Sequence, residues 1–141
     1  MLYILDTDHI SLLQRGNRIV LEQLLMVPIP DRATTIISLA EQFLGWWTEI
    51  TRAKNETDTA RSFRYLQETA TFFHTLPVLP YDNTAAAEFE RLRRSKVRIG
   101  TQDLRIAAIA LSRNAAVITR NLRDFRQVPG LIVIDWSTPA A

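Results

Sequence analysis

Short apolar runs alternate with longer stretches of helical periodicity along the chain. Runs at 2–5, 34–37, 77–80, 115–118 and 131–134 are rich in aliphatic and β-branched residues and predict five strands. Between most of these runs, apolar residues recur at spacings of three and four, which predicts helices. Apolar strands separated by helices are typical of an α/β domain with a mostly parallel sheet covered on both faces.

Composition limits the other classes. The chain has 141 residues, of which 47% are hydrophobic, so we interpret residues 1–141 as a single domain with a real core. No stretch approaches ~20 apolar residues and the N-terminus lacks a basic region, so neither a membrane span nor a signal peptide is predicted. The chain contains no cysteine, which excludes disulfides and thiolate metal sites. A cytoplasmic location fits this composition.

Four acidic residues are expected at the carboxyl edge of the predicted sheet, where ligands bind in such folds. Asp6 directly follows the first strand, and Asp124 lies in the loop after the fourth. Glu41 lies in the first turn of the helix after the second strand, and Asp103 in the first turn of the helix that leads into the fourth.

Each of these acids also has a local explanation. Asp6 can cap a helix, and Glu41 can complete a capping box with Ser38 as the N-cap. Asp103 can interact favourably with the helix dipole, and Asp124 can serve a turn. Their common location is what favours a functional interpretation. Asp8 is interpreted as a cap or as a helper beside Asp6.

Converging carboxylates repel one another and are costly to desolvate unless a cation joins them. Hard divalent cations prefer oxygen ligands, so Mg²⁺ is the expected cofactor, with Mn²⁺ as the alternative. Such an ion can activate a water and stabilise the charge that develops on a phosphodiester. The two histidines, His9 and His74, are interpreted as structural or exposed.

Charge is distributed unevenly, although the net charge is only +2. Residues 91–126 contain ten Arg or Lys and two acids, whereas residues 1–90 are net acidic. A basic stretch around isolated acids suits a polyanionic ligand held near a cation site. An arginine-rich helix face exposed to solvent explains the same pattern equally well.

Four segments, taken in order, resemble the PIN-domain ribonucleases, specifically the VapC-type toxins of bacterial toxin–antitoxin pairs. LDTD at 5–8 resembles the opening motif of the family, and ISLAEQFLG at 37–45 resembles its acid-before-glycine motif. IGTQDLRIAA at 99–108 and VITRNLRDF at 117–125 resemble the two later motifs. The resemblance spans nearly the whole chain.

This resemblance implies a three-layer α/β/α PIN-like fold with a five-stranded parallel sheet in the order 3-2-1-4-5. It implies a metal-dependent endoribonuclease that cleaves RNA with a metal-activated water, a homodimer, and a cognate VapB-like antitoxin. Asp6, Glu41 and Asp103 would be the metal-binding acids, with Asp124 as a fourth. Asn121, Thr119 and Asp8 would assist them, and RNA would contact Lys96, Arg98, Arg120 and Arg123. The pattern assigns no role to Trp46 and Trp47, which can be core, dimer or antitoxin contacts.

Two other functions remain open from the sequence. The Asp6-Thr7-Asp8 sequence after a strand also resembles the start of haloacid-dehalogenase-like phosphatases, in which the first Asp is a nucleophile. Those enzymes use a lysine, and this chain has only Lys54 and Lys96, neither suitably placed. A non-catalytic PIN-like binding module is the other alternative; it predicts missing acids, but all four are present.

Overall fold

A computed structural model describes residues 1–139. Within them, five parallel strands form one sheet in the order β3-β2-β1-β4-β5, which confirms the predicted topology. The strands are β1 (Tyr3–Leu5), β2 (Arg32–Thr35), β3 (Val78–Leu79), β4 (Ala116–Ile118) and β5 (Ile132–Ile134).

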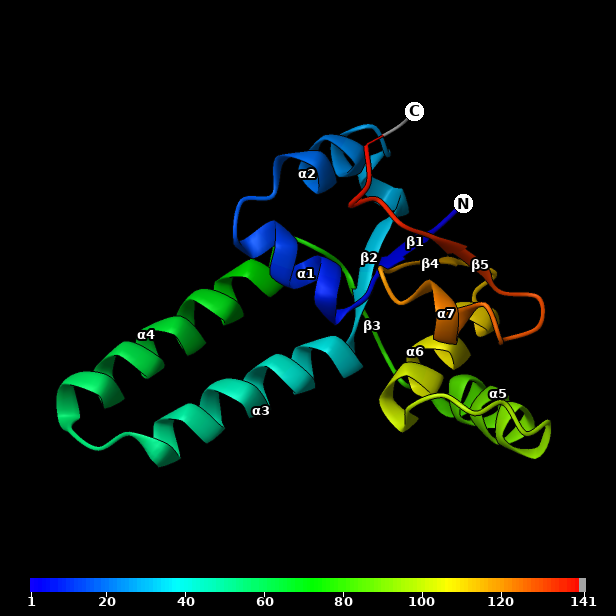
Figure 1. Ribbon diagram of the computed structural model, residues 1–141. Helices are drawn as coiled ribbons and strands as arrows, with labels where there is room; N and C mark the ends of the chain where they lie inside the picture. Colours follow the sequence, from blue (N-terminus) through cyan, green and yellow to red (C-terminus); the bar gives the residue numbers. More distant parts are fainter. Residues whose placement is uncertain (140–141) are drawn as a thin grey trace.

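Helices connect these strands and cover both faces of the sheet (Figure 1). None of the helices in residues 1–139 combines the length and the hydropathy that a membrane span requires. The helical elements are α1 (Thr7–Gln14), α2 (Arg18–Leu25), the 3-10 turn η1 (Ile29–Asp31), α3 (Ile36–Arg52), α4 (Glu56–Phe73), α5 (Asn83–Arg94), α6 (Thr101–Ser112) and α7 (Leu122–Phe125).

Two hydrophobic cores lie on opposite faces of the sheet because successive strand residues point to opposite sides. Ile4 of β1 packs in the core that α5 and α6 cover, with Val117 of β4. Leu5 packs in the other core, with Ile118 and with residues of α1, α2 and α4. The result is the three-layer α/β/α arrangement, with the sheet as its middle layer.

Helix α6 contains the most apolar of the predicted helical stretches. Its residues Ile106–Ala110 are almost completely inaccessible to solvent, as its composition predicts for a core helix. Arg105 is the polar residue within this stretch, and its guanidinium lies over the rings of Phe89 and Tyr81, 5.3 and 5.9 Å from their centroids. This stacking accommodates a cation among apolar neighbours.

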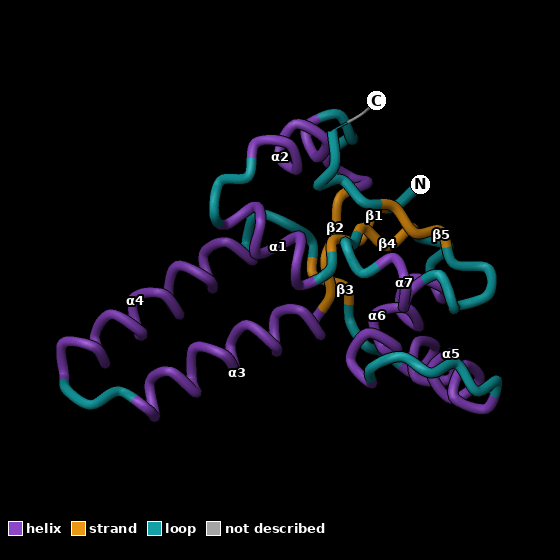
Figure 2. Tube along the Cα trace, viewed as in Figure 1, coloured by secondary structure: helices purple, strands orange, loops and turns teal. Residues whose placement is uncertain are grey.

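Helices α3 and α4 form a long hairpin that projects away from the sheet (Figures 1 and 2). Leu44, Trp47 and Phe63 on this hairpin are 66%, 53% and 46% exposed. Isolated exposed apolar residues are common, but an accumulation on one projecting element is typical of contact surfaces. The hairpin begins next to the sheet, so α3 connects this surface to the edge at which the acids lie.

Candidate metal-binding site

A small pocket of about 360 Å³ lies at the carboxyl edge of the central strands. It brings together side chains from the junction of β1 and α1, from α1, α3 and α6, and from the segment after β4, which are far apart in the sequence. Three of the four predicted acids line it. The lining residues are Asp6, Thr7, Asp8, Ser11, Glu41, Asp103 and Asn121.

Asp6 occupies the position where β1 turns into α1. Its backbone N–H donates to the carbonyl of Ile118 at 3.0 Å, which continues the pairing of β1 with β4. Its side chain caps α1, because Oδ1 accepts the backbone N–H of His9 at 2.9 Å. Asp6 is therefore both a helix cap and a pocket residue, and its 5% exposure shows how closely the fold surrounds it.

Glu41 lies in the second turn of α3, not in a capping box. The predicted N-cap at Ser38 is wrong, because strand β2 ends at Thr35 and the helix begins at Ile36. The Thr35 hydroxyl caps the helix by accepting the N–H of Ser38 at 3.2 Å. The Ser38 side chain is buried and accepts a hydrogen bond from the Thr7 hydroxyl at 3.0 Å. Glu41 therefore has no capping duty and lies in the pocket.

The environment of Glu41 opposes its ionisation. Burial is the main cause that raises the pKa of its carboxyl, and the charges of Asp103 and Asp6 raise it further. The nearby hydroxyl of Thr7 opposes this rise in the pKa of Glu41. The interaction with Asp103 and Asp6 shows that the three acids, from three different elements, influence one another electrostatically.

Asp103 lies in the first turn of α6, as predicted. Burial, followed by the charge of Asp6, raises the pKa of its carboxyl, while a hydrogen bond from Asn121 lowers it. The Asn121 amide donates through Nδ2 to Asp103 Oδ2 at 3.2 Å and to Asp124 Oδ2 at 3.0 Å. Asn121 therefore holds two acids in a fixed relation.

Asp124 accepts a hydrogen bond from Asn121 but is absent from the pocket lining described above. It is in the short helix α7, whereas the sequence predicted a loop at this point. The carbonyl of Asn121 accepts the N–H of Phe125 at 3.2 Å, which is the first hydrogen bond of this helix. Phe125 is fully buried and anchors the turn.

A second group of potential ligands also includes Asp6. One ligand atom each of Asp6, Asp8 and His9 lie within 4.8 Å of one another. Two of these residues have other partners, however. Both carboxylate oxygens of Asp8 accept hydrogen bonds from Arg120, at 2.5 and 2.6 Å, and this contact lowers the pKa of Asp8. His9 is fully buried, and its Nε2 accepts the N–H of Trp136 at 3.3 Å.

The residue types that line the pocket are those that hard divalent cations prefer. Asp6, Glu41 and Asp103 offer only carboxylate oxygens, and two of these groups have pKa values raised by burial and by the neighbouring acids. A bound cation removes that repulsion and favours the ionised form of each group. The ligand atoms of Asp6, Asp8 and His9 lie close enough together to hold a metal ion. Glu41 and Asp103 line the same pocket as Asp6. Thiolate ligands are absent from the sequence, which disfavours soft metals.

The remaining predicted residues occupy different positions. Thr119 is fully buried, and its Oγ1 accepts the N–H of Asn121 at 2.9 Å, so it shapes the segment after β4 and does not face a phosphate. Arg123, Lys96 and Arg98 are exposed, and no hydrogen bond or salt bridge within residues 1–139 joins them to the acids. Arg120 is thus the predicted RNA-binding cation that the structure brings to the pocket.

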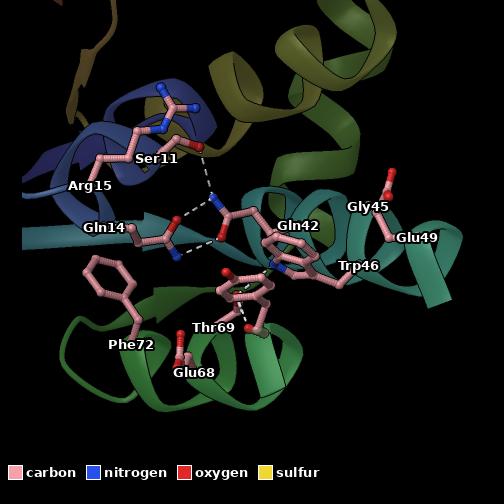
Figure 3. A pocket seen from close by; sticks show the side chains of 11 residues that line it. Ser11, Gln14, Arg15, Gln42, Gly45, Trp46, Glu49, Glu68, Thr69 and Phe72 are labelled. Atoms are coloured by element: carbon pink, nitrogen blue, oxygen red, sulfur yellow. Dashed lines mark hydrogen bonds between the residues drawn. The ribbon is translucent and has the colours of Figure 1, made fainter. Parts of the chain in front are cut away.

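A larger groove of about 830 Å³ lies between α1, α3 and α4 (Figure 3). The side chains of Ser11, Gln14 and Gln42 are hydrogen-bonded across it, and the Gln42 amide donates to Ser11 Oγ at 3.2 Å. Trp46 stacks on Tyr65 with ring centroids 5.0 Å apart and donates to Thr69 Oγ1 at 2.9 Å. Ser11 lines both the groove and the acidic pocket, so the two cavities are neighbours.

Sequence reasoning missed this groove and the buried contacts of His9. The groove joins residues of three helices that lie between positions 11 and 72, and no local motif indicates their proximity. For His9, the distant partner is the backbone of Trp136, and a backbone donor leaves no signal in side-chain types. The phosphatase alternative is disfavoured, because neither Lys54 nor Lys96 lines the acidic pocket.

Fold and pocket together define an α/β/α protein with a carboxylate pocket, suited to a metal ion, at the carboxyl edge of a parallel sheet. Comparison with known proteins identifies the family within this class. Residues 3–131 match the PIN domain family. Ribonuclease VapC5 of Mycobacterium tuberculosis is 34% identical over 137 residues, which cover 94% of this chain and 91% of the relative. The chain therefore belongs to the PIN domain family, and within it to the VapC ribonucleases.

Two further similarities are informative. The tRNA(fMet)-specific endonuclease VapC of Salmonella typhimurium is 41% identical over 69 residues, which cover 46% of this chain and 52% of that protein. The match therefore spans about half the length of that relative. The solved structure of VapBC-1 from nontypeable Haemophilus influenzae is similar over 98% of this chain and 100% of that chain, with a TM-score of 0.76 and 26% identity.

Proposed function

We propose that residues 1–141 act as one PIN domain, a Mg²⁺-dependent endoribonuclease that is the toxin of a type II toxin–antitoxin system. The observation that carries this proposal is the convergence of Asp6, Glu41 and Asp103 in one pocket, with the pKa values of Glu41 and Asp103 raised. Raised pKa values in a cleft are characteristic of functional carboxylates. Membership of the VapC ribonucleases supports the same activity.

Asp6, Glu41 and Asp103 would hold the cation, with Mg²⁺ preferred and Mn²⁺ accepted, since both favour oxygen ligands. Bound there, the ion supplies Lewis-acid activation of water and neutralises charge on the phosphodiester. Asn121 orients Asp103 by donating to its Oδ2, and Asp124 fixes Asn121 in turn. Asp124 is thus a positioning residue in this proposal.

Arg120 is proposed to bind an RNA phosphate at the rim of the pocket. It is exposed, and its guanidinium already lies beside the acids through its contact with Asp8. Exposed Arg123, Arg98 and Lys96 would add longer-range attraction for the RNA backbone. A structured RNA with a single-stranded loop is the expected substrate class, since sequence-specific proteins read unpaired bases. The Salmonella relative, named for tRNA(fMet), makes initiator tRNA the first substrate to test.

A VapB-like antitoxin is the proposed partner, since the Haemophilus neighbour is a VapBC structure. The groove between α1, α3 and α4 suits it. It is lined by Trp46, Tyr65 and Phe72 together with charged Arg15 and Glu49, and it adjoins the acidic pocket at Ser11. A segment bound there would lie next to the acids and block RNA. A homodimer is also proposed, and the exposed residues Trp47 and Phe63 of the hairpin are available for it.

Expression of the wild type and of Asp6→Asn in a bacterial host tests this function. Asp6→Asn keeps a side-chain oxygen that can cap α1 but removes the charge that a cation needs. We expect growth arrest and accumulation of cleaved RNA for the wild type, and neither for the variant at equal protein level. Equal toxicity of the two proteins would indicate a binding effect and contradict the proposed catalysis.

A further inference from the structure

His9 presents an unusual polar atom directly behind the pocket. Its side chain is completely inaccessible to solvent, and in residues 1–139 its Nδ1 is the buried side-chain nitrogen or oxygen that has no hydrogen-bond partner. The nearby acceptor is Asp6 Oδ1, at 3.5 Å. An unpaired buried donor is costly, so its position beside a pocket acid calls for an explanation.

The hydrogen bonds around the imidazole define which nitrogen carries the proton. The backbone N–H of Trp136 donates to Nε2 at 3.3 Å, and that bond requires Nε2 to be unprotonated. Asp135 Oδ1 lies 3.6 Å from the same nitrogen, but it accepts hydrogen bonds from the N–H and the hydroxyl of Ser137 at 2.7 and 2.6 Å. With Nε2 as an acceptor, the ring carries its proton on Nδ1, which faces Asp6.

Asp6 Oδ1 is consequently approached by two donors from one residue. The backbone N–H of His9 donates to it at 2.9 Å, and the Nδ1–H group faces it at 3.5 Å. A movement of about half an ångström would bring the second donor into hydrogen-bond range. No protein donor within residues 1–139 hydrogen-bonds the other oxygen, Oδ2. One edge of the carboxylate is thus turned toward α1, and the other is left for a ligand.

We infer that His9 is a positioning residue that orients the Asp6 carboxylate for a divalent cation, by facing Oδ1 with its Nδ1–H and leaving Oδ2 free. This inference rests on the proposed function, because it assumes that Asp6 is a metal ligand. Carboxylates that bind metals are generally held by such outer hydrogen bonds, and loss of the donor typically weakens metal binding about 10–100-fold. Trp136, which follows β5, completes the arrangement by fixing the tautomer of the ring.

Binding of Mn²⁺ to the purified protein without RNA, measured by calorimetry, tests the inference. His9→Leu fills the space but removes the donor. His9→Asn places an amide N–H near the position of Nδ1, whereas His9→Gln extends its amide toward Trp136. We expect His9→Leu and His9→Gln to weaken Mn²⁺ binding about tenfold or more. His9→Asn should stay within about threefold of the wild type, and so should His74→Asn, which changes the exposed histidine.

Melting temperatures separate orientation from folding. If His9 only fills space, the Mn²⁺ affinity of each variant will change in parallel with its melting temperature. The His9→Leu and His9→Asn variants will then bind Mn²⁺ equally well. Wild-type affinity in folded His9→Leu, or equal weakening in His9→Asn and His9→Gln, would overturn the inference. If His9→Leu does not fold, the Asn and Gln variants decide in the same way. Failure of the wild type itself to bind Mn²⁺ would instead contradict the proposed function.

Discussion

The amide of Asn121 joins Asp103 and Asp124, because its Nδ2 donates to an oxygen of each at 3.2 and 3.0 Å. The backbone of Asn121 is fixed as well, by the buried hydroxyl of Thr119. A neutral donor between two acids reduces their repulsion and sets the direction in which each carboxylate points. In this arrangement Asp103 lines the pocket, whereas Asp124 contacts Asn121 from outside the pocket lining.

Asn121→Ala should therefore weaken metal binding about tenfold or more, in line with the loss of other outer hydrogen bonds. Asn121→Asp should be more severe, because it replaces the donor with a third charge. Mn²⁺ calorimetry measures both effects, with Asn114→Gly as a control, since Asn114 lies in a turn outside the pocket with a left-handed backbone that glycine adopts readily. Unchanged affinity in Asn121→Ala would show that Asp103 needs no such support.

Arg120→Ala should reduce the affinity for RNA by several-fold. It should also lower the slope of log affinity against log salt concentration by about one, because one fewer counterion is released on binding. The Arg120 side chain is 49% exposed, so stability should change little. Binding titrations at several salt concentrations measure the slope. Arg61→Ala is the matched control, because Arg61 forms an equally exposed pair with Asp58 on the projecting hairpin. Identical slopes for the two variants would contradict a phosphate contact at Arg120.

Asp103→Asn should raise the melting temperature of the metal-free protein at pH 7 by roughly 1–3 °C. Burial and the charge of Asp6 raise the pKa of Asp103 above its ordinary value of 3.8. Its contribution to stability is therefore complete below that value and is lost as the pH rises through the folded-state pKa. The gain should vanish near pH 3 and reverse with saturating Mg²⁺, which stabilises only the wild type.

Thermal unfolding in EDTA between about pH 3 and pH 7 checks the sign of the change in melting temperature. Glu90→Gln removes an exposed acid that pairs with Arg93 and serves as the control for a general charge effect. Lower stability of Asp103→Asn than of the wild type at pH 7 in EDTA would mean that the pocket acids do not repel one another.

Thr35→Ala should destabilise the protein by about 1–2 kcal/mol, because the Thr35 hydroxyl caps α3. Thr35→Ser keeps the capping oxygen and should retain most of the stability. Denaturant unfolding measures the difference between the two variants. Equal destabilisation by Ala and Ser would indicate that the methyl group of Thr35, and not its hydroxyl, is what matters.

Much of this structure could be predicted from the sequence. The apolar runs specified five strands, and the carboxyl-edge rule brought Asp6, Glu41 and Asp103 to one place. The sequence was less informative about the N-cap of α3, because two nearby residues can both cap a helix. Thr35 and Ser38 both favour an N-cap, and the choice depends on where β2 stops pairing, which is at Thr35 beside Leu79. The resemblance to VapC-type toxins supplied the strand order.

Contacts between distant segments could not be predicted. The side chains of Asp8 and Arg120 are 112 positions apart, and their ion pair depends on β1 and β4 being neighbours. Arg120 was predicted to bind RNA, and nothing in the sequence indicated that its side chain pairs with Asp8. Asp124 was predicted as a fourth ligand; it lies outside the pocket lining, in a short helix where a loop was expected, and Asn121 links it to Asp103.

Cleavage of RNA by the purified protein with and without a divalent cation tests the central claim most directly. Wild-type protein incubated with initiator tRNA and a pool of total RNA should cut specific sites in Mg²⁺. Excess EDTA should abolish cleavage and productive binding, because the unneutralised carboxylates repel phosphate. Added Mg²⁺ or Mn²⁺ should restore both in the wild type but not in Asp103→Asn. Equal cleavage in excess EDTA, or by the folded variant, would contradict the account.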